Sequence, residues 1–95
     1  MQFEWDEAKD RANRAKHGIG FDRAVRVFEG DYVTALARPG PDGEVRYNTI
    51  GVLDEVLIVS VIHTDRHGVT RIISARPAKR KERKFYDGQN RKGQT

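Results

Sequence analysis

The chain has 95 residues, of which 37% are hydrophobic and 34% charged, so it can enclose one modest core and is too short for two domains. It contains no cysteine, which excludes a disulfide scaffold, a thiolate zinc site and a cysteine nucleophile. The net charge of +4 is uneven, because residues 1–63 hold 8 Lys/Arg and 11 Asp/Glu, for −3, whereas residues 64–95 hold 10 and 3, for +7.

The first element is a short strand. Gln2–Trp5 alternates polar and apolar residues, with Phe3 and Trp5 on one side, a pattern that suits a strand or a lead into the following helix. Met1–Arg11 has no charged n-region followed by an apolar segment, so we expect no secretory signal and a cytoplasmic protein.

Two helices follow this segment. Asp6 can cap a helix over Glu7–His17, and Gly18 stands where a left-handed C-terminal residue is favoured. Asp22 can cap a second, shorter helix that ends before Gly30. We expect the first helix to lie on a sheet through small residues at helical spacing, which are Ala8, Ala12 and Ala15.

Four segments rich in β-branched residues then predict an antiparallel meander: Asp31–Arg38, Val45–Leu53, Val56–Thr64 and Val69–Ala75. The turn signals between them are Pro39–Gly43, Asp54-Glu55 and His67-Gly68. The third segment contains the longest aliphatic stretch, which is far shorter than the roughly 20 residues of a membrane-spanning helix. We therefore expect a buried strand and no membrane contact.

The C-terminal part is basic. Pro77 can occupy the first turn of a helix, and Ala78–Tyr86 consists mainly of helix formers and positive charge. Residues 88–95 contain no apolar side chain, which predicts a flexible tail after a single domain over residues 1–87. The predicted fold class is α+β, with a four-stranded antiparallel meander, two N-terminal helices and a basic C-terminal helix.

Several sequence segments resemble those of the BrnT family of bacterial type II toxins, and together they span about Phe3 to Tyr86. They are Phe3-Glu4-Trp5-Asp6-Glu7-Ala8-Lys9, Asn13, Lys16-His17-Gly18, Phe21, Arg71-Ile72-Ile73-Ser74-Ala75-Arg76 and Glu82-Arg83-x-x-Tyr86. The resemblance implies a RelE-like fold and a toxin that cleaves RNA and inhibits translation. It also implies a DNA-binding antitoxin of the BrnA type that neutralises the toxin, with operator DNA bound only through that antitoxin.

RNA cleavage without a metal needs groups that take and give protons, and fixed cations that stabilise charge on the phosphorus oxygens. His17 is the best acid/base candidate because an imidazole titrates near neutral pH. A cation at this helix end also complements the helix dipole, so a purely structural role stays open. Lys16 and Lys9, which fall on roughly the same helical face, are better candidates for contacts to RNA phosphates than for bases.

Two arginines are candidates for the cationic clamp. Arg76 closes the last predicted strand, so its planar guanidinium, which matches a phosphate, would stand on a rigid element. Arg46 lies in a strand and by itself could equally face solvent; the resemblance to the family favours a site role. Arg71, which precedes Ile72 in the last strand, is less constrained.

Arg80, Arg83 and Lys84 can share one face of the last helix and contact RNA, although such a run is more often a solvated surface. The resemblance singles out Arg83 and Tyr86. Tyr86 could stack on a base, or belong to the core beside Phe85.

A metal site is one interpretation of a short segment with two imidazoles and a carboxylate, which are His63, Asp65 and His67. They flank a strand end and a turn, and no third distant ligand is suggested, so we expect turn chemistry, no metal and no cofactor. The function hypothesis is thus a metal-independent endoribonuclease toxin that acts on RNA. The alternative is a non-catalytic nucleic-acid-binding module that acts within a protein–DNA complex.

Overall fold

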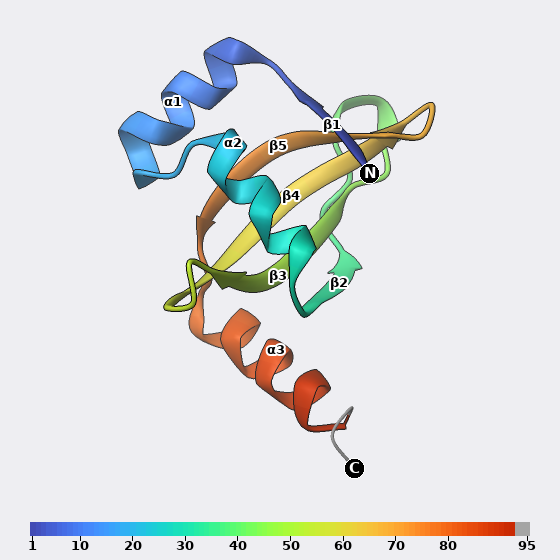
Figure 1. The fold of residues 1–95 in the computed structure, drawn as a ribbon. Helices are drawn as coiled ribbons and strands as arrows, with labels where there is room; N and C mark the ends of the chain where they lie inside the picture. Colours follow the sequence, from blue (N-terminus) through green and yellow to red (C-terminus); the bar gives the residue numbers. More distant parts are fainter. Residues whose placement is uncertain (93–95) are drawn as a thin grey trace.

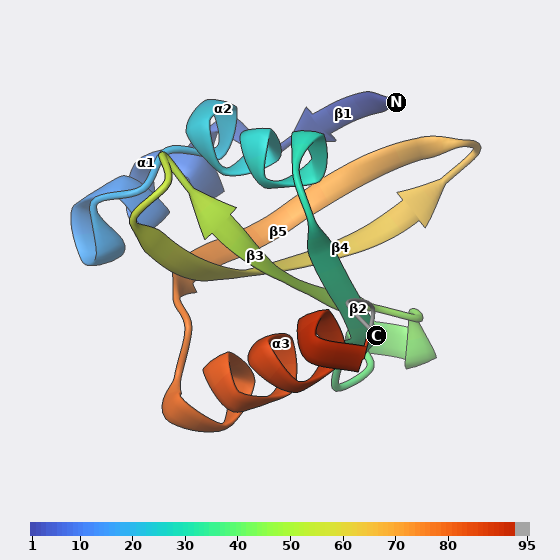
Figure 2. The ribbon, with the colours of Figure 1, turned by 60° about the horizontal axis from the view of Figure 1, so that its bottom comes forward.

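The computed structural model describes residues 1–92, which form an α+β fold with three α-helices and one five-stranded mixed sheet of order β1-β5-β4-β3-β2 (Figure 1). Helices α1 and α2 lie on one side of the sheet and α3 on the other (Figure 2). In chain order the elements are β1 (Gln2–Trp5), α1 (Glu7–His17), α2 (Phe21–Ala24), the 3₁₀ helix η1 (Val25–Glu29), β2 (Tyr32–Leu36), the 3₁₀ helix η2 (Pro41–Gly43), β3 (Tyr47–Leu53), β4 (Leu57–Arg66), β5 (Val69–Pro77) and α3 (Arg80–Lys92).

The meander prediction is confirmed for β2 to β5, which pair antiparallel in chain order. The prediction of only four strands, all antiparallel, is wrong because β1 adds a fifth strand parallel to β5, with Gln2 opposite Val69. Apolar contacts on the core side hold β1 in place, since the Phe3 ring lies 5.3 Å from that of Phe28. Local periodicity identifies a strand but does not reveal a partner so distant in the sequence.

The turns follow the predicted residues with one adjustment. His67 and Gly68 have positive φ angles and form a two-residue turn between β4 and β5. Asp54 and Glu55 also have positive φ, but the turn between β3 and β4 includes Val56, which is 87% exposed. β4 therefore starts one residue later than expected.

Helix α1 has the predicted bounds. Asp6 accepts hydrogen bonds from the first turn, and Gly18 ends the helix with φ of +73°. The expected alanine contact with the sheet is wrong, because Ala8, Ala12 and Ala15 are exposed. The buried side chains of α1 are instead Asp10 and Asn13. Polar contacts rather than apolar area thus attach this helix.

The second helix is shorter than predicted. Only Phe21–Ala24 is α-helical, and the chain continues as the 3₁₀ helix η1. Asp22 lies inside the first turn, and the preceding Gly20 gives no side-chain cap. Without that cap, burial of Phe21 and Ala24 fixes the segment against the sheet, in a core with Ile19, Val27, Leu53, Val59, Val61, Ile72 and Ala75.

Helix α3 differs from the prediction at both ends. Pro77 is the last residue of β5 rather than part of a first helical turn, and the helix runs from Arg80 to Lys92. Ala78 and Tyr86 pack with Ile50 of β3 in a second, smaller core. Helical backbone covers much of the predicted tail, whose flexibility stays a prediction, and residues 93–95 lie outside the described part. No helix within residues 1–92 is long and apolar enough to span a membrane.

Candidate active site

A shallow groove of about 260 Å³ runs between α1 and β5. It brings together three of the predicted site residues, Lys9, Lys16 and His17, which lie on α1. Ile73 and Ser74 of β5 form part of the opposite wall, and Ala12 and Asn13 complete the lining. The groove therefore combines two lysines, an imidazole and a hydroxyl.

The groove exists because α1 continues along the edge of β5 where β1 ends. β1 pairs with β5 only as far as Ile72, so the next residues of β5 have β4 on one side and no strand on the other. Asn13 takes that place: its Nδ2 donates to the Ala75 oxygen (2.7 Å), and its Oδ1 accepts from the Ala75 nitrogen (3.1 Å). Nδ2 also donates to the Ile19 oxygen at 2.8 Å. One buried amide thus replaces a strand partner and fixes the helix beside the sheet.

Two further features shape the groove. Asp10 accepts a hydrogen bond from the Phe21 nitrogen at 2.8 Å, which ties α1 to α2. The register between β4 and β5 shifts by one residue, with His63 opposite Ile72 and Ile62 opposite Ser74. Ile73 is therefore the extra residue of a β-bulge, a feature that redirects side chains beside many active sites.

Arg76 lies two residues beyond Ser74, so strand alternation places both side chains on the same sheet face. Its guanidinium forms a bidentate ion pair with Glu82 of α3, with Nη1–Oε1 at 2.7 Å and Nη2–Oε2 at 3.0 Å. Asn48 Nδ2 and the Lys79 nitrogen also donate to Glu82, each at 2.8 Å, and Ser60 Oγ lies 3.2 Å from it. Burial raises the pKa of Glu82, but the hydrogen bonds from Arg76, the Lys79 nitrogen and Asn48 outweigh it and lower that pKa from 4.5 to about 2.

Neither Arg76 nor Arg46 is among the residues that line the groove. Arg46 precedes β3, two strands away from β5, and its Nε donates to Glu44 at 3.2 Å. Arg66 also donates to Glu44, at 3.0 Å, and hydrogen bonds from Arg66 and then Arg46 lower the pKa of this carboxyl. Arg71 forms an ion pair with Glu4 of β1. The structure thus separates Arg46 from His17.

The candidates on α3 divide into exposed and buried groups. Arg80, Arg83 and Lys84 are exposed, and Arg83 Nη1 donates to the Ala78 oxygen at 3.0 Å. Tyr86 is only 7% exposed, and its hydroxyl donates to the Asp31 oxygen at 3.4 Å. Its place in the core favours the structural role over stacking on a base.

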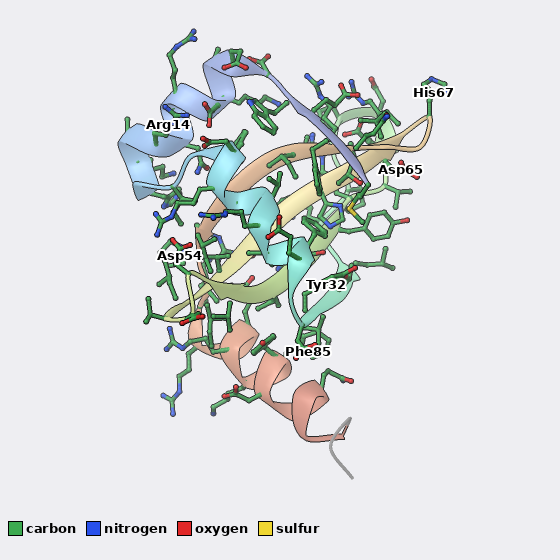
Figure 3. The ribbon with its side chains drawn as sticks, viewed as in Figure 1. Arg14, Tyr32, Asp54, Asp65, His67 and Phe85 are labelled. Atoms are coloured by element: carbon green, nitrogen blue, oxygen red, sulfur yellow. The ribbon has the colours of Figure 1, made fainter. Side chains whose placement is uncertain are left out.

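The three residues of the possible metal site, His63, Asp65 and His67, lie in different environments. His63 is buried, shares a hydrogen bond with Thr49 Oγ1 (2.7 Å) and stacks on Tyr47. Burial lowers the pKa of His63. Asp65 and His67 lie on the exposed hairpin between β4 and β5 (Figure 3). Within residues 1–92 no three His, Cys, Asp or Glu residues come close enough to hold a metal ion.

Sequence reasoning assigned no role to Asn13, Ser74 or Glu82. Asn13 and Ser74 belong to the sequence segments that resemble the BrnT family. A polar residue in such a segment does not indicate which main-chain group it binds or which cavity it lines. Glu82 carried a signal, since it is the one acidic residue in the basic run Lys79–Lys84. An isolated carboxylate among cations predicts an ion pair, although not its partner.

The family described as "Ribonuclease toxin, BrnT, of type II toxin-antitoxin system" matches residues 5–82. The crystal structure of the Brucella abortus ribonuclease toxin, BrnT, aligns with 84% of this chain and 99% of its own, at 28% identity and a TM-score of 0.64. No curated protein sequence matches the chain at a significant level.

Proposed function

Because the chain belongs to the BrnT family of ribonuclease toxins of type II toxin–antitoxin systems, we propose that it cleaves RNA in the groove between α1 and β5. The observation that carries this proposal is the position of His17, Lys9 and Lys16 around one cavity, two residues along β5 from Arg76. Cleavage of RNA would inhibit translation until a cognate antitoxin of the BrnA type binds.

The groove supplies the groups that transphosphorylation needs. In this reaction the 2′-oxygen of a ribose attacks the adjacent phosphorus, the bond to the 5′-oxygen breaks, and a 2′,3′-cyclic phosphate and a 5′-hydroxyl result. His17 supplies an imidazole, the side-chain type that most often acts as general acid or base. Lys9 and Lys16 bind the phosphate oxygens, and Arg76 stabilises the charge that builds on them.

The donor set also supports cleavage without a metal. A divalent cation in a nuclease site is held mainly by carboxylates, whereas the described residues that line the groove include no Asp or Glu. The surface contributes cations and an imidazole instead. We propose that the activity is independent of divalent metals.

The test is cleavage of a 5′-labelled RNA by purified protein in the presence of EDTA. A matched RNA with 2′-O-methyl groups serves as the substrate control, because it lacks the attacking hydroxyl. We expect cleavage of the unmodified RNA only, and a loss of ~10² in rate for His17→Gln, since proton transfer typically contributes 10²–10⁴. His67→Asn is the matched histidine control, because His67 lies on the exposed β4–β5 hairpin with a positive φ that Asn tolerates.

One observation favours the second candidate function, a nucleic-acid-binding module without catalysis. The guanidinium of Arg76 already binds Glu82, and Tyr86 is buried. Two side chains that were predicted to contact RNA therefore make contacts within the protein instead. RNA binding without cleavage of either RNA, in protein that still binds its antitoxin on operator DNA, would favour this candidate.

A further inference from the structure

We propose that Glu82 is a positioning residue for the reaction proposed above, on which this inference rests. Its carboxylate holds the guanidinium of Arg76 in one plane, so that the free edge of that group can meet a phosphate at the groove. Glu82 itself touches no substrate. Its effect on the reaction passes through Arg76.

The contacts of Glu82 are unusual for a helix residue, because they join α3 to three neighbouring strands. It accepts four hydrogen bonds, from Asn48 of β3, both terminal nitrogens of Arg76 in β5, and the Lys79 nitrogen. The Ser60 hydroxyl of β4 lies 3.2 Å from Glu82 and donates its single proton to the Asn48 oxygen at 2.6 Å, which fixes the amide orientation. The carboxylate therefore has little freedom to rotate, and Arg76 shares that restriction.

Glu82 binds only one edge of the Arg76 guanidinium, so a second edge stays available. A guanidinium presents two bidentate edges of different geometry, one formed by Nη1 and Nη2 and one by Nε and Nη2. Glu82 takes the first edge, while Nη1 also donates to the Pro77 oxygen at 3.3 Å. Among the side chains that the structure describes, in residues 1–89, Nε–H has no hydrogen-bond partner. A phosphate could bind there without displacing Glu82.

The alternative role for Glu82 is to hold α3 on the sheet. That helix has its own apolar contacts, since Ala78 and Tyr86 pack on Ile50 with Val33, Val52 and Ile58 around them. A carboxylate aimed at the plane of an arginine is not needed for this packing. The two roles separate in kinetics, because a positioning residue changes the rate through Arg76 alone.

The test compares kcat and KM of Glu82→Gln, Arg76→Ala and the double variant. Gln keeps the size of Glu82 but replaces one acceptor oxygen with an amide that cannot accept from Arg76. We expect Glu82→Gln to lower kcat by ~10–100-fold with little change in KM, since a misplacement of about 1 Å can cost 10²-fold. In the Arg76→Ala background the same substitution should have no further effect.

Asp54→Asn is the matched control, because Asp54 also bridges two arginines, Arg23 and Arg26, but at the turn between β3 and β4 (Figure 3). A folded Glu82→Gln protein with unchanged kcat would overturn the proposal, and so would rate losses that add in the double variant. If Glu82→Gln does not fold, Glu82→Asp decides: the shorter carboxylate should lower kcat, and full activity would refute positioning.

Failure of the proposed function is recognised separately. If the wild-type protein cleaves no RNA, the Nη–H resonances of Arg76 in NMR spectra still test the geometry, because Glu82 accepts from both terminal nitrogens. We expect these resonances to be protected from solvent exchange in the wild type and in Asp54→Asn, and to broaden in Glu82→Gln. Equally protected resonances in Glu82→Gln would overturn the positioning role, whatever the fate of the ribonuclease hypothesis.

Discussion

Replacement of Asn13 by alanine tests how α1 is attached. The buried amide makes three hydrogen bonds, two to Ala75 and one to Ile19, and each uses a main-chain group that no strand satisfies. In Asn13→Ala these groups lose their partner inside the protein, at about 1 kcal/mol each. The better helix propensity of alanine recovers about 0.5 kcal/mol. The free energy of unfolding should therefore fall by about 2–3 kcal/mol.

Thermal unfolding measures this loss directly. A domain of this size loses about 4–8 °C in Tm per kcal/mol, so Asn13→Ala should melt about 10–20 °C below the wild type. Arg11→Ala is the matched control on the same helix, because Arg11 is exposed and its removal should change stability by no more than about 0.5 kcal/mol. Hydrogen exchange should show the lost protection at the Ala75 N–H.

A small change in Tm would contradict this prediction. If Asn13→Ala melts within about 2 °C of the wild type, water or a local shift replaces the amide at little cost, and the helix is not held by this side chain. If the Tm of Arg11→Ala fell as far as that of Asn13→Ala, any side-chain truncation in α1 would destabilise the protein. Either result would refute the conclusion that one buried amide fixes the groove.

Induced expression without an antitoxin should arrest growth and lower protein synthesis; normal growth at a high level of folded protein would refute the toxin function. Charge reversal of Arg80 and Lys84, which are both exposed, should weaken binding to RNA and to the antitoxin if both use this surface, whereas unchanged antitoxin affinity and salt dependence would place its docking elsewhere. Because the pKa of Glu82 is lowered to about 2, its contribution to stability is complete above about pH 4.5 and is lost as the pH falls toward 2; Glu82→Gln should remove this part of the acid-unfolding curve, and identical curves would contradict the assignment.

The elements that the sequence predicted well depend on local chemistry. The bounds of α1 follow from the cap at Asp6 and from the left-handed conformation at Gly18. The β4–β5 turn follows from His67 and Gly68, which tolerate positive φ. Such signals involve residues only a few positions apart, and for that reason a single sequence is sufficient to read them.

The features that the sequence did not reveal depend on distant partners. Asn13 and Ala75 are separated by 62 positions, and Asn48 and Glu82 by 34. The alanine spacing in α1 predicted an apolar contact because helices usually dock through apolar area. Here the hydrogen bonds of Asp10 and Asn13 do this instead, with the three alanines exposed.

Distance along the chain also explains why the sequence predicted only part of the candidate site. Lys9, Lys16 and His17 share one helix, so their proximity could be inferred, whereas the positions of Arg46 and Arg76 depend on the sheet register. Consecutive residues of β5 are held from opposite sides of the sheet: Asn13 of α1 binds the main chain of Ala75, and Glu82 of α3 binds the side chain of Arg76. Because the two helices act on different groups of the same segment, loss of either contact should displace the proposed phosphate clamp without unfolding the core, which is built mainly from other residues.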